Sequence, residues 1–70
     1  MQSVDLHGIR HSEVPDIIIE CCAMYDTPFV VITGNSNRMK RIVRDTAAQF
    51  NLKVKDAINN PGRVVISESR

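Results

Sequence analysis

The stretch that decides the fold is residues 29–44, which reads FVVITGNSNRMKRIVR. Its first part, residues 29–33, is a nearly continuous apolar run, and such a run is typical of a buried central strand. Residues 34–37 follow as a tight turn of small and polar side chains. Apolar residues then recur at helical spacing and predict a helix over about 37–50. The stripe of this helix consists of Met39, Ile42, Val43, Thr46, Ala47 and Phe50.

The same helix begins with a cluster of four basic residues. Arg38, Lys40, Arg41 and Arg44 lie in its first turns, and no acidic residue precedes Asp45. Cations are unfavourable at a helix N-terminus because the helix dipole is positive there. The arrangement is favourable if an anion such as phosphate binds the free backbone N–H groups at this end. The alternative is a solvated basic face without a ligand.

The chain before this stretch predicts a strand followed by a helix. Residues 3–7 alternate polar and apolar side chains, as in a half-buried strand, and Gly8 ends it. A helix is expected over about 12–25, with Ser12 as its N-cap and Pro15 in its first turn. Its apolar stripe consists of Val14, Ile17, Ile18, Cys21, Cys22 and Tyr25.

The chain after it predicts two further strands, of which the first alternates lysines with apolar residues over 52–55 and the second covers 63–67, after a turn at 59–62. The resulting order is β-α-β-α-β-β. Two right-handed crossovers place both helices on the same side of the sheet. We therefore expect an α/β fold, a two-layer α+β sandwich with a four-stranded mixed sheet and two helices on one face, as a single domain over 1–70. The expected core is Val4, Leu6, Ile17, Cys21, Val31, Ile42, Val43, Phe50, Val54, Val65 and their neighbours, with Tyr25 and Phe29.

The net charge of +1 conceals two oppositely charged segments. Residues 1–26 contain five acidic residues and one arginine, a net charge of −4, whereas residues 34–55 carry a net charge of +5. Such a chain can steer a polyanion onto one surface.

The two cysteines, Cys21 and Cys22, are adjacent in a predicted helix and cannot form a relaxed disulfide. Together with the lack of a membrane-spanning run or signal-peptide pattern, these thiols lead us to expect a cytoplasmic protein.

Asp5 and His7 are the residues most suited to proton transfer. They lie two apart on the first strand, so their side chains share a face at its C-terminal end. An imidazole exchanges protons near neutral pH, and a carboxylate can orient the ring. If the first two strands are parallel neighbours, Thr33 and Gly34 reach the same end of the sheet, where α/β folds usually form their sites. The alternative is a polar pair on a surface strand.

Two motifs resemble those of the Smr (small MutS-related) domain family. Val4-Asp5-Leu6-His7-Gly8 is similar to the family's Leu-Asp-x-His-Gly stretch at the end of its first strand. Thr33-Gly34-Asn35-Ser36 is similar to its His- or Thr-Gly-x-Gly loop after the second strand. The element order and the basic helix also correspond, and the resemblance covers residues 3–68. Two positions depart from the family pattern, since Ser36 replaces the second loop glycine and Val4 the usual leucine.

This resemblance implies a nucleic-acid-binding domain that cleaves RNA or nicks DNA, with a fold similar to the C-terminal domain of bacterial translation initiation factor three. It implies that Asp5 and His7 are catalytic and that the loop holds the strand. The complete set expected to bind phosphate is Thr33, Gly34, Asn35, Ser36, Arg38, Lys40, Arg41, Arg44 and Arg10.

The sequence and the resemblance thus predict a monomeric endonuclease that acts on RNA in preference to DNA. We expect it to be metal-independent or weakly metal-dependent and to hold no cofactor. Few aromatic residues are present, so recognition is expected to depend on phosphate and shape. Two alternatives stay open. One is a non-catalytic nucleic-acid-binding module whose loop has degenerated at Ser36. The other is a protein-interaction domain whose basic helix meets an acidic partner.

Overall fold

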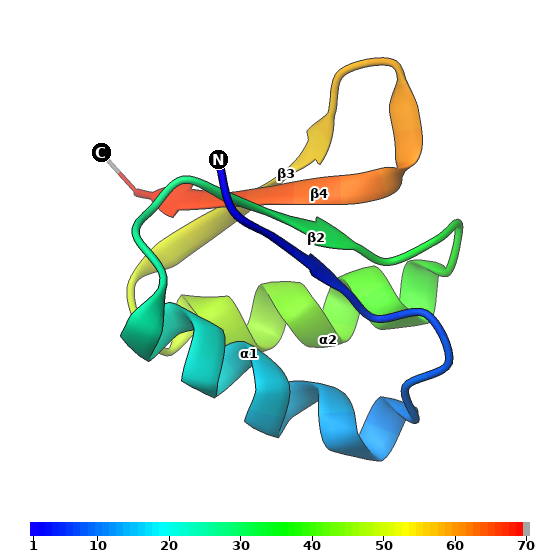
Figure 1. The fold of residues 1–70 in the computed structure, drawn as a ribbon, viewed down its shortest axis with the longest axis horizontal. Coiled ribbons are helices and arrows are strands. Elements are labelled where there is room, and N and C mark those ends of the chain that lie inside the picture. Colours follow the sequence, from blue (N-terminus) through cyan, green and yellow to red (C-terminus); the bar gives the residue numbers. More distant parts are fainter. Residues whose placement is uncertain (70) are drawn as a thin grey trace.

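Two helices cover one face of a four-stranded sheet in the computed structural model, which describes residues 1–69 (Figure 1). The predicted order of strands and helices and the two-layer arrangement are confirmed. In chain order the elements are β1 (Ser3–Asp5), the 3-10 helix η1 (His11–Glu13), α1 (Val14–Met24), β2 (Phe29–Ile32), α2 (Asn37–Ala48), β3 (Leu52–Ala57) and β4 (Asn60–Glu68).

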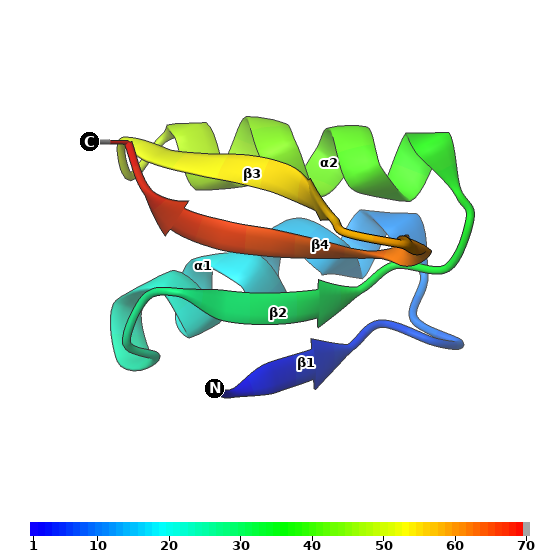
Figure 2. The same ribbon diagram turned by 90° about the horizontal axis from the view of Figure 1, so that it is seen from above.

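The sheet is mixed, and its strands lie in the order β1-β2-β4-β3 (Figure 2). β1 pairs with β2 in parallel, while β4 is antiparallel to both of its neighbours, β2 and β3. The crossover through α1 therefore joins adjacent strands, and the crossover through α2 passes over the place that β4 fills. The last strand of the chain is thus a central strand.

The N-terminal end of α1 differs from the prediction. Val14, Ile18 and Cys21 form its buried stripe, but Ser12 is not its N-cap. Residues 11–13 form η1 instead, and neither helix has a side-chain cap. The reason is Pro15, which would be the third residue of a helix capped by Ser12. It has no N–H group to donate to a capping hydroxyl.

α2 begins with a side-chain cap. The Ser36 Oγ accepts a hydrogen bond of 3.0 Å from the backbone N–H of Met39, so Ser36 is the N-cap. Met39 and Val43 are among its buried residues. The helix ends at Ala48, two residues earlier than predicted, so the expected burial of Phe50 is wrong. Phe50 lies in the turn beyond the helix and is 40% exposed.

The register of β4 also differs from the expected core. Val65 was expected to be buried, but the fully buried residues of this strand are its neighbours Val64 and Ile66. They lie opposite Val31 and Phe29 of β2, which face the helices. A run of three apolar residues shows no alternation, so only the pairing with β2 decides which of them point into the core.

The turn between β3 and β4 was expected at residues 59–62 but lies earlier. Ile58 and Asn59 form it, and Asn59 takes a left-handed φ of 59°. Residues 60–62 belong to β4, where the pairing register with β3 shifts between Asp56 and Ala57. On the other side of β4, the Gly62 carbonyl accepts hydrogen bonds from the loop after β2.

The two cysteines are free thiols on α1. Cys21 belongs to the core and Cys22 is half-buried against it. Burial raises the pKa of both thiols. Among residues 1–69, no helix has the length and apolar character needed to cross a membrane.

Candidate nucleic-acid interface

The parallel pairing of β1 and β2 brings two loops to one end of the sheet. Asp5 is aligned with Ile32, and the Leu6 N–H donates a 3.0 Å hydrogen bond to the Ile32 carbonyl. The next residues, His7 and Gly8, therefore leave the sheet beside Thr33. Figures 1 and 2 both show the β1–α1 connection and the β2–α2 loop at the same end of the molecule, together with the β3–β4 hairpin.

Asp5 organises the turn that carries His7. Its Oδ1 accepts a hydrogen bond of 2.8 Å from the backbone N–H of His7. Gly8 follows with a left-handed φ of 77°, which a glycine adopts without strain. The carboxylate was expected to orient the imidazole, and its contact in the structure is with the His7 backbone. Both side chains are exposed at the end of β1.

Thr33 and Gly34 are fixed by the carbonyl of Gly62 on β4. That oxygen accepts hydrogen bonds of 2.9 Å from the Thr33 N–H and 3.0 Å from the Gly34 N–H. Thr33 is buried, with 7% of its surface exposed. Its hydroxyl donates a hydrogen bond of 2.9 Å to the Gly34 carbonyl. Both backbone donors are thus occupied within the fold. These hydrogen bonds fix the shape of the loop at Thr33 and Gly34.

The residues that follow lie at the N-terminus of α2. Asn35 and Asn37 are exposed, and Ser36 is half-buried with its oxygen engaged as the helix cap. The first turn of α2 contains no acidic residue. Of the backbone N–H groups ahead of the first intrahelical bond, that of Met39 donates to the Ser36 hydroxyl, and the group as a whole forms the positive end of the helix dipole.

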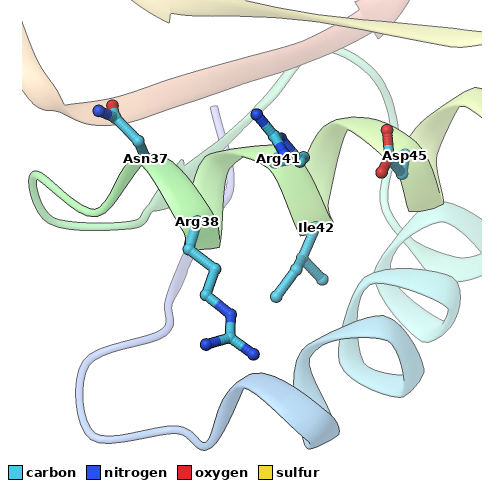
Figure 3. A pocket seen from close by; sticks show the side chains of 5 residues that line it. All are labelled: Asn37, Arg38, Arg41, Ile42 and Asp45. Carbon is cyan, nitrogen blue, oxygen red and sulfur yellow. The ribbon is translucent and has the colours of Figure 1, made fainter.

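The basic residues of α2 divide between two sides of the helix. Arg38 and Arg41 line an open hollow of about 530 Å³ on its outer side, together with Asn37, Ile42 and Asp45 (Figure 3). The Arg38 side chain extends from α2 towards the segment that leads into α1 (Figure 3). Arg10 is exposed in that segment, and Arg44 is exposed further along α2.

Lys40 lies apart from this group. Its side chain is only 14% exposed, and its Nζ is 3.8 Å from Asp56 Oδ1 on β3. Because Lys40 points to the sheet side of α2, the structure does not bring it together with Arg38 and Arg41. Within residues 1–69 this is the single ion pair at 4.0 Å or less.

Two residues near the site were not singled out in the sequence. Gly62 anchors the loop, but its Asn-Pro-Gly setting indicated only a turn. Arg63 lies opposite Ile32, in the same cross-strand row as Asp5. Its position follows from strand alternation once the correct register of β4 is known.

Within the described chain, no three histidine, cysteine or acidic side chains gather as a metal site would require.

No protein-family model matches this chain, and neither the curated proteins nor the solved structures contain a match to it. The fold and site geometry, together with the motifs at residues 4–8 and 33–36, therefore carry the functional argument.

Proposed function

We propose that this chain is a nucleic-acid-binding domain of the Smr type that cleaves RNA at the end of the sheet where β1 and β2 terminate. The observation that carries the proposal is the parallel pairing of these strands. This pairing brings Asp5 and His7, the proposed acid–base pair, to the same end of the sheet as the loop at Gly34. The N-terminus of α2 also lies at this end, and its first turn contains no acidic residue.

The proposed chemistry is attack by a neighbouring 2′-hydroxyl on the phosphorus atom. This breaks the bond to the 5′-oxygen and leaves a cyclic phosphate on one product and a 5′-hydroxyl on the other. His7 transfers a proton to or from the reacting oxygens, and Asp5 holds the turn in which His7 lies. Arg38 and the free N–H groups of the α2 N-terminus stabilise the charge that develops on the phosphate.

Two further features support a proposal about the compartment and the oligomeric state of this protein. Both cysteines are free thiols, which is typical of proteins in reducing compartments. Among residues 1–69, Arg38, Arg41 and Arg44 on the outer side of α2 have no carboxylate within 4.0 Å, and like charge disfavours pairing of this surface with its copy in a second chain. We accordingly extend the proposal to a monomeric protein of the cytoplasm.

The test is cleavage of end-labelled single-stranded and hairpin RNA by the wild type and by His7→Ala. General acid–base catalysis contributes about 10²–10⁴-fold in rate, so His7→Ala should lose activity by that factor while it still binds RNA. The second histidine of the chain provides the matched control, because His11→Ala lies in η1 and should cleave normally. A 2′-deoxy substitution at the cut site should block the reaction.

Two outcomes would contradict the catalytic part of the proposal. Equal cleavage by the wild type and His7→Ala would mean that another ribonuclease is responsible. RNA binding without cleavage of any substrate would instead identify a non-catalytic binding module, with Ser36 as the first departure from the family loop to be reverted to glycine.

A further inference from the structure

The face of the sheet opposite the helices carries cations that the proposed site does not use. Both helices lie on one side in Figure 1, so within residues 1–69 the other side has no covering element. Leu52 and Val54 of β3 and Val64 of β4 point into the core. Because side chains alternate along a strand, their neighbours Lys53, Lys55 and Arg63 lie on this uncovered face. None of the three cations has a carboxylate within 4.0 Å among the described residues.

An apolar strip lies beside these cations on the same face. Val30, Ile32 and Val65 are half-buried, although they are not packed against the core cluster. Lys55, Val65 and Val30 form one cross-strand row, since each lies opposite the next. Side chains in such rows are about 5 Å apart. The cations thus border the apolar strip on its β3 side.

The uncovered face leads to the candidate catalytic residues. Arg63, Ile32 and Asp5 form the next cross-strand row, which ends at β1 beside the His7 turn. By contrast, Arg38 and Arg41 line their hollow on the opposite, helical side of the molecule (Figure 3). A nucleic-acid strand that reaches Asp5 across the sheet therefore contacts Lys53, Lys55 and Arg63 before it reaches α2.

We infer that the uncovered face of the sheet is a track for single-stranded nucleic acid, an inference that rests on the proposed function and extends it. The phosphates contact Lys53, Lys55 and Arg63, and the bases lie over Val30, Ile32 and Val65. Unpaired bases are required for the second contact, because a duplex offers only its backbone to a flat surface. Aliphatic side chains form no hydrogen bonds with base edges, so we expect binding on the track to depend little on sequence.

The track is tested with fluorescein-labelled oligouridylates of four and twelve nucleotides, titrated at several salt concentrations. The wild type should bind the longer strand more tightly, and the K53Q/K55Q/R63Q variant should lose that gain with length. Loss of three phosphate contacts lowers the log–log salt slope by about 2, since each contact on a single strand contributes about 0.7. A slope change of 2 corresponds to a factor of about 100 for each tenfold change in salt. Relative to their affinities at 1 M salt, the variant should therefore bind the longer strand about 100-fold more weakly than the wild type at 0.1 M salt.

Two variants serve as controls. R38Q/R41Q/R44Q removes the same charge from the helical side, and it should weaken binding of both strands while it keeps the gain with length. K53R/K55R/R63K retains the charge and should bind like the wild type. Circular dichroism and thermal unfolding establish that each variant is folded before binding is compared.

The results separate this inference from the proposed function. If the wild type binds no RNA, both fail. If the wild type binds but K53Q/K55Q/R63Q keeps the full gain with length, the track alone is overturned. Equal losses in the two glutamine variants would indicate a non-specific charge effect and would also overturn it. The track is also overturned if a twelve-base-pair duplex binds as tightly as the single strand. It is overturned as well if an oligoglutamate peptide binds this face of the sheet and RNA does not.

Discussion

Asp5 combines two roles that substitution can separate. Asparagine keeps an oxygen that can accept the His7 N–H, whereas alanine removes the acceptor of this 2.8 Å bond. We expect Asp5→Ala to lower the free energy of unfolding by about 0.5–1.5 kcal/mol and Asp5→Asn to leave it nearly unchanged. Under the proposed function both variants lose cleavage, because both remove the negative charge beside His7. Urea unfolding and cleavage rates measure the two effects, and equal unfolding free energies in all three proteins would contradict the structural role.

Gly34 provides a second prediction at this scale. Its φ is 67°, and an added Cβ would have nothing within 4 Å, so backbone conformation alone decides the effect of a side chain. Gly34→Ala should therefore lower the free energy of unfolding by about 1–2 kcal/mol. Gly62→Ala is the matched control, since its Cβ would meet Gly34 at an ordinary 3.6 Å. Thermal unfolding compares the two, and an equal shift in Tm would show that crowding rather than the left-handed backbone is responsible.

At the scale of elements, the prediction concerns the beginning of each helix. Ser36 caps α2 through its hydroxyl, whereas Ser12 caps neither η1 nor α1. Ser36→Ala should lower the free energy of unfolding by about 1 kcal/mol, and Ser36→Gly by only a few tenths. Ser12→Ala, the serine favoured by sequence alone in the first helix, should change it little. Chemical denaturation of the three variants provides the comparison, and a larger loss in Ser12→Ala would contradict the assigned caps.

The same elements show how far the sequence determines the fold. The stripes of α1 and α2 alternate apolar and polar residues with a helical period, so their buried faces follow directly from the chain. β4 lacks this signal, because Val64, Val65 and Ile66 are all apolar and their partners on β2 are distant in sequence. The prediction therefore buried the wrong residue of β4, and it could not place Arg63 in the same cross-strand row as Asp5. The convergence of the two loops was predictable, because it requires only that β1 and β2 are parallel neighbours.

At the scale of the whole molecule, basic side chains lie on both outer surfaces of the sandwich. Arg38 and Arg41 lie on the helical side, and Lys53, Lys55 and Arg63 lie on the sheet side. The two sides meet at the end where Asp5, His7 and Gly34 are found. The sequence identified Arg38, Arg41, Lys53 and Lys55 as members of one basic segment, residues 34–55, and Arg63 lies outside that segment. It could not divide them between surfaces, because that division depends on the direction of each side chain from its element.

The last prediction concerns the stability of the whole fold at alkaline pH. Burial raises the pKa of the Cys21 and Cys22 thiols above their ordinary value, and the charges of Cys22 and Glu20 add to the shift at Cys21. Above that ordinary value the unfolded chain loses thiol protons that the folded chain retains. The unfolded state then binds fewer protons, so the free energy of unfolding falls as pH rises.

The stabilisation from the neutral thiols is therefore complete below the ordinary thiol pKa, near 8.5, and is lost as pH rises through the folded values. Other groups of the chain also respond to alkaline pH, so the comparison needs a variant without thiols. C21A/C22A should be less stable at pH 7, because alanine leaves space in the core cluster to which Cys21 belongs. The difference in unfolding free energy between the wild type and this variant, measured in urea, should shrink steadily as the pH rises above about 8. A constant difference would show that the thiols ionise in the folded protein as readily as in the unfolded chain.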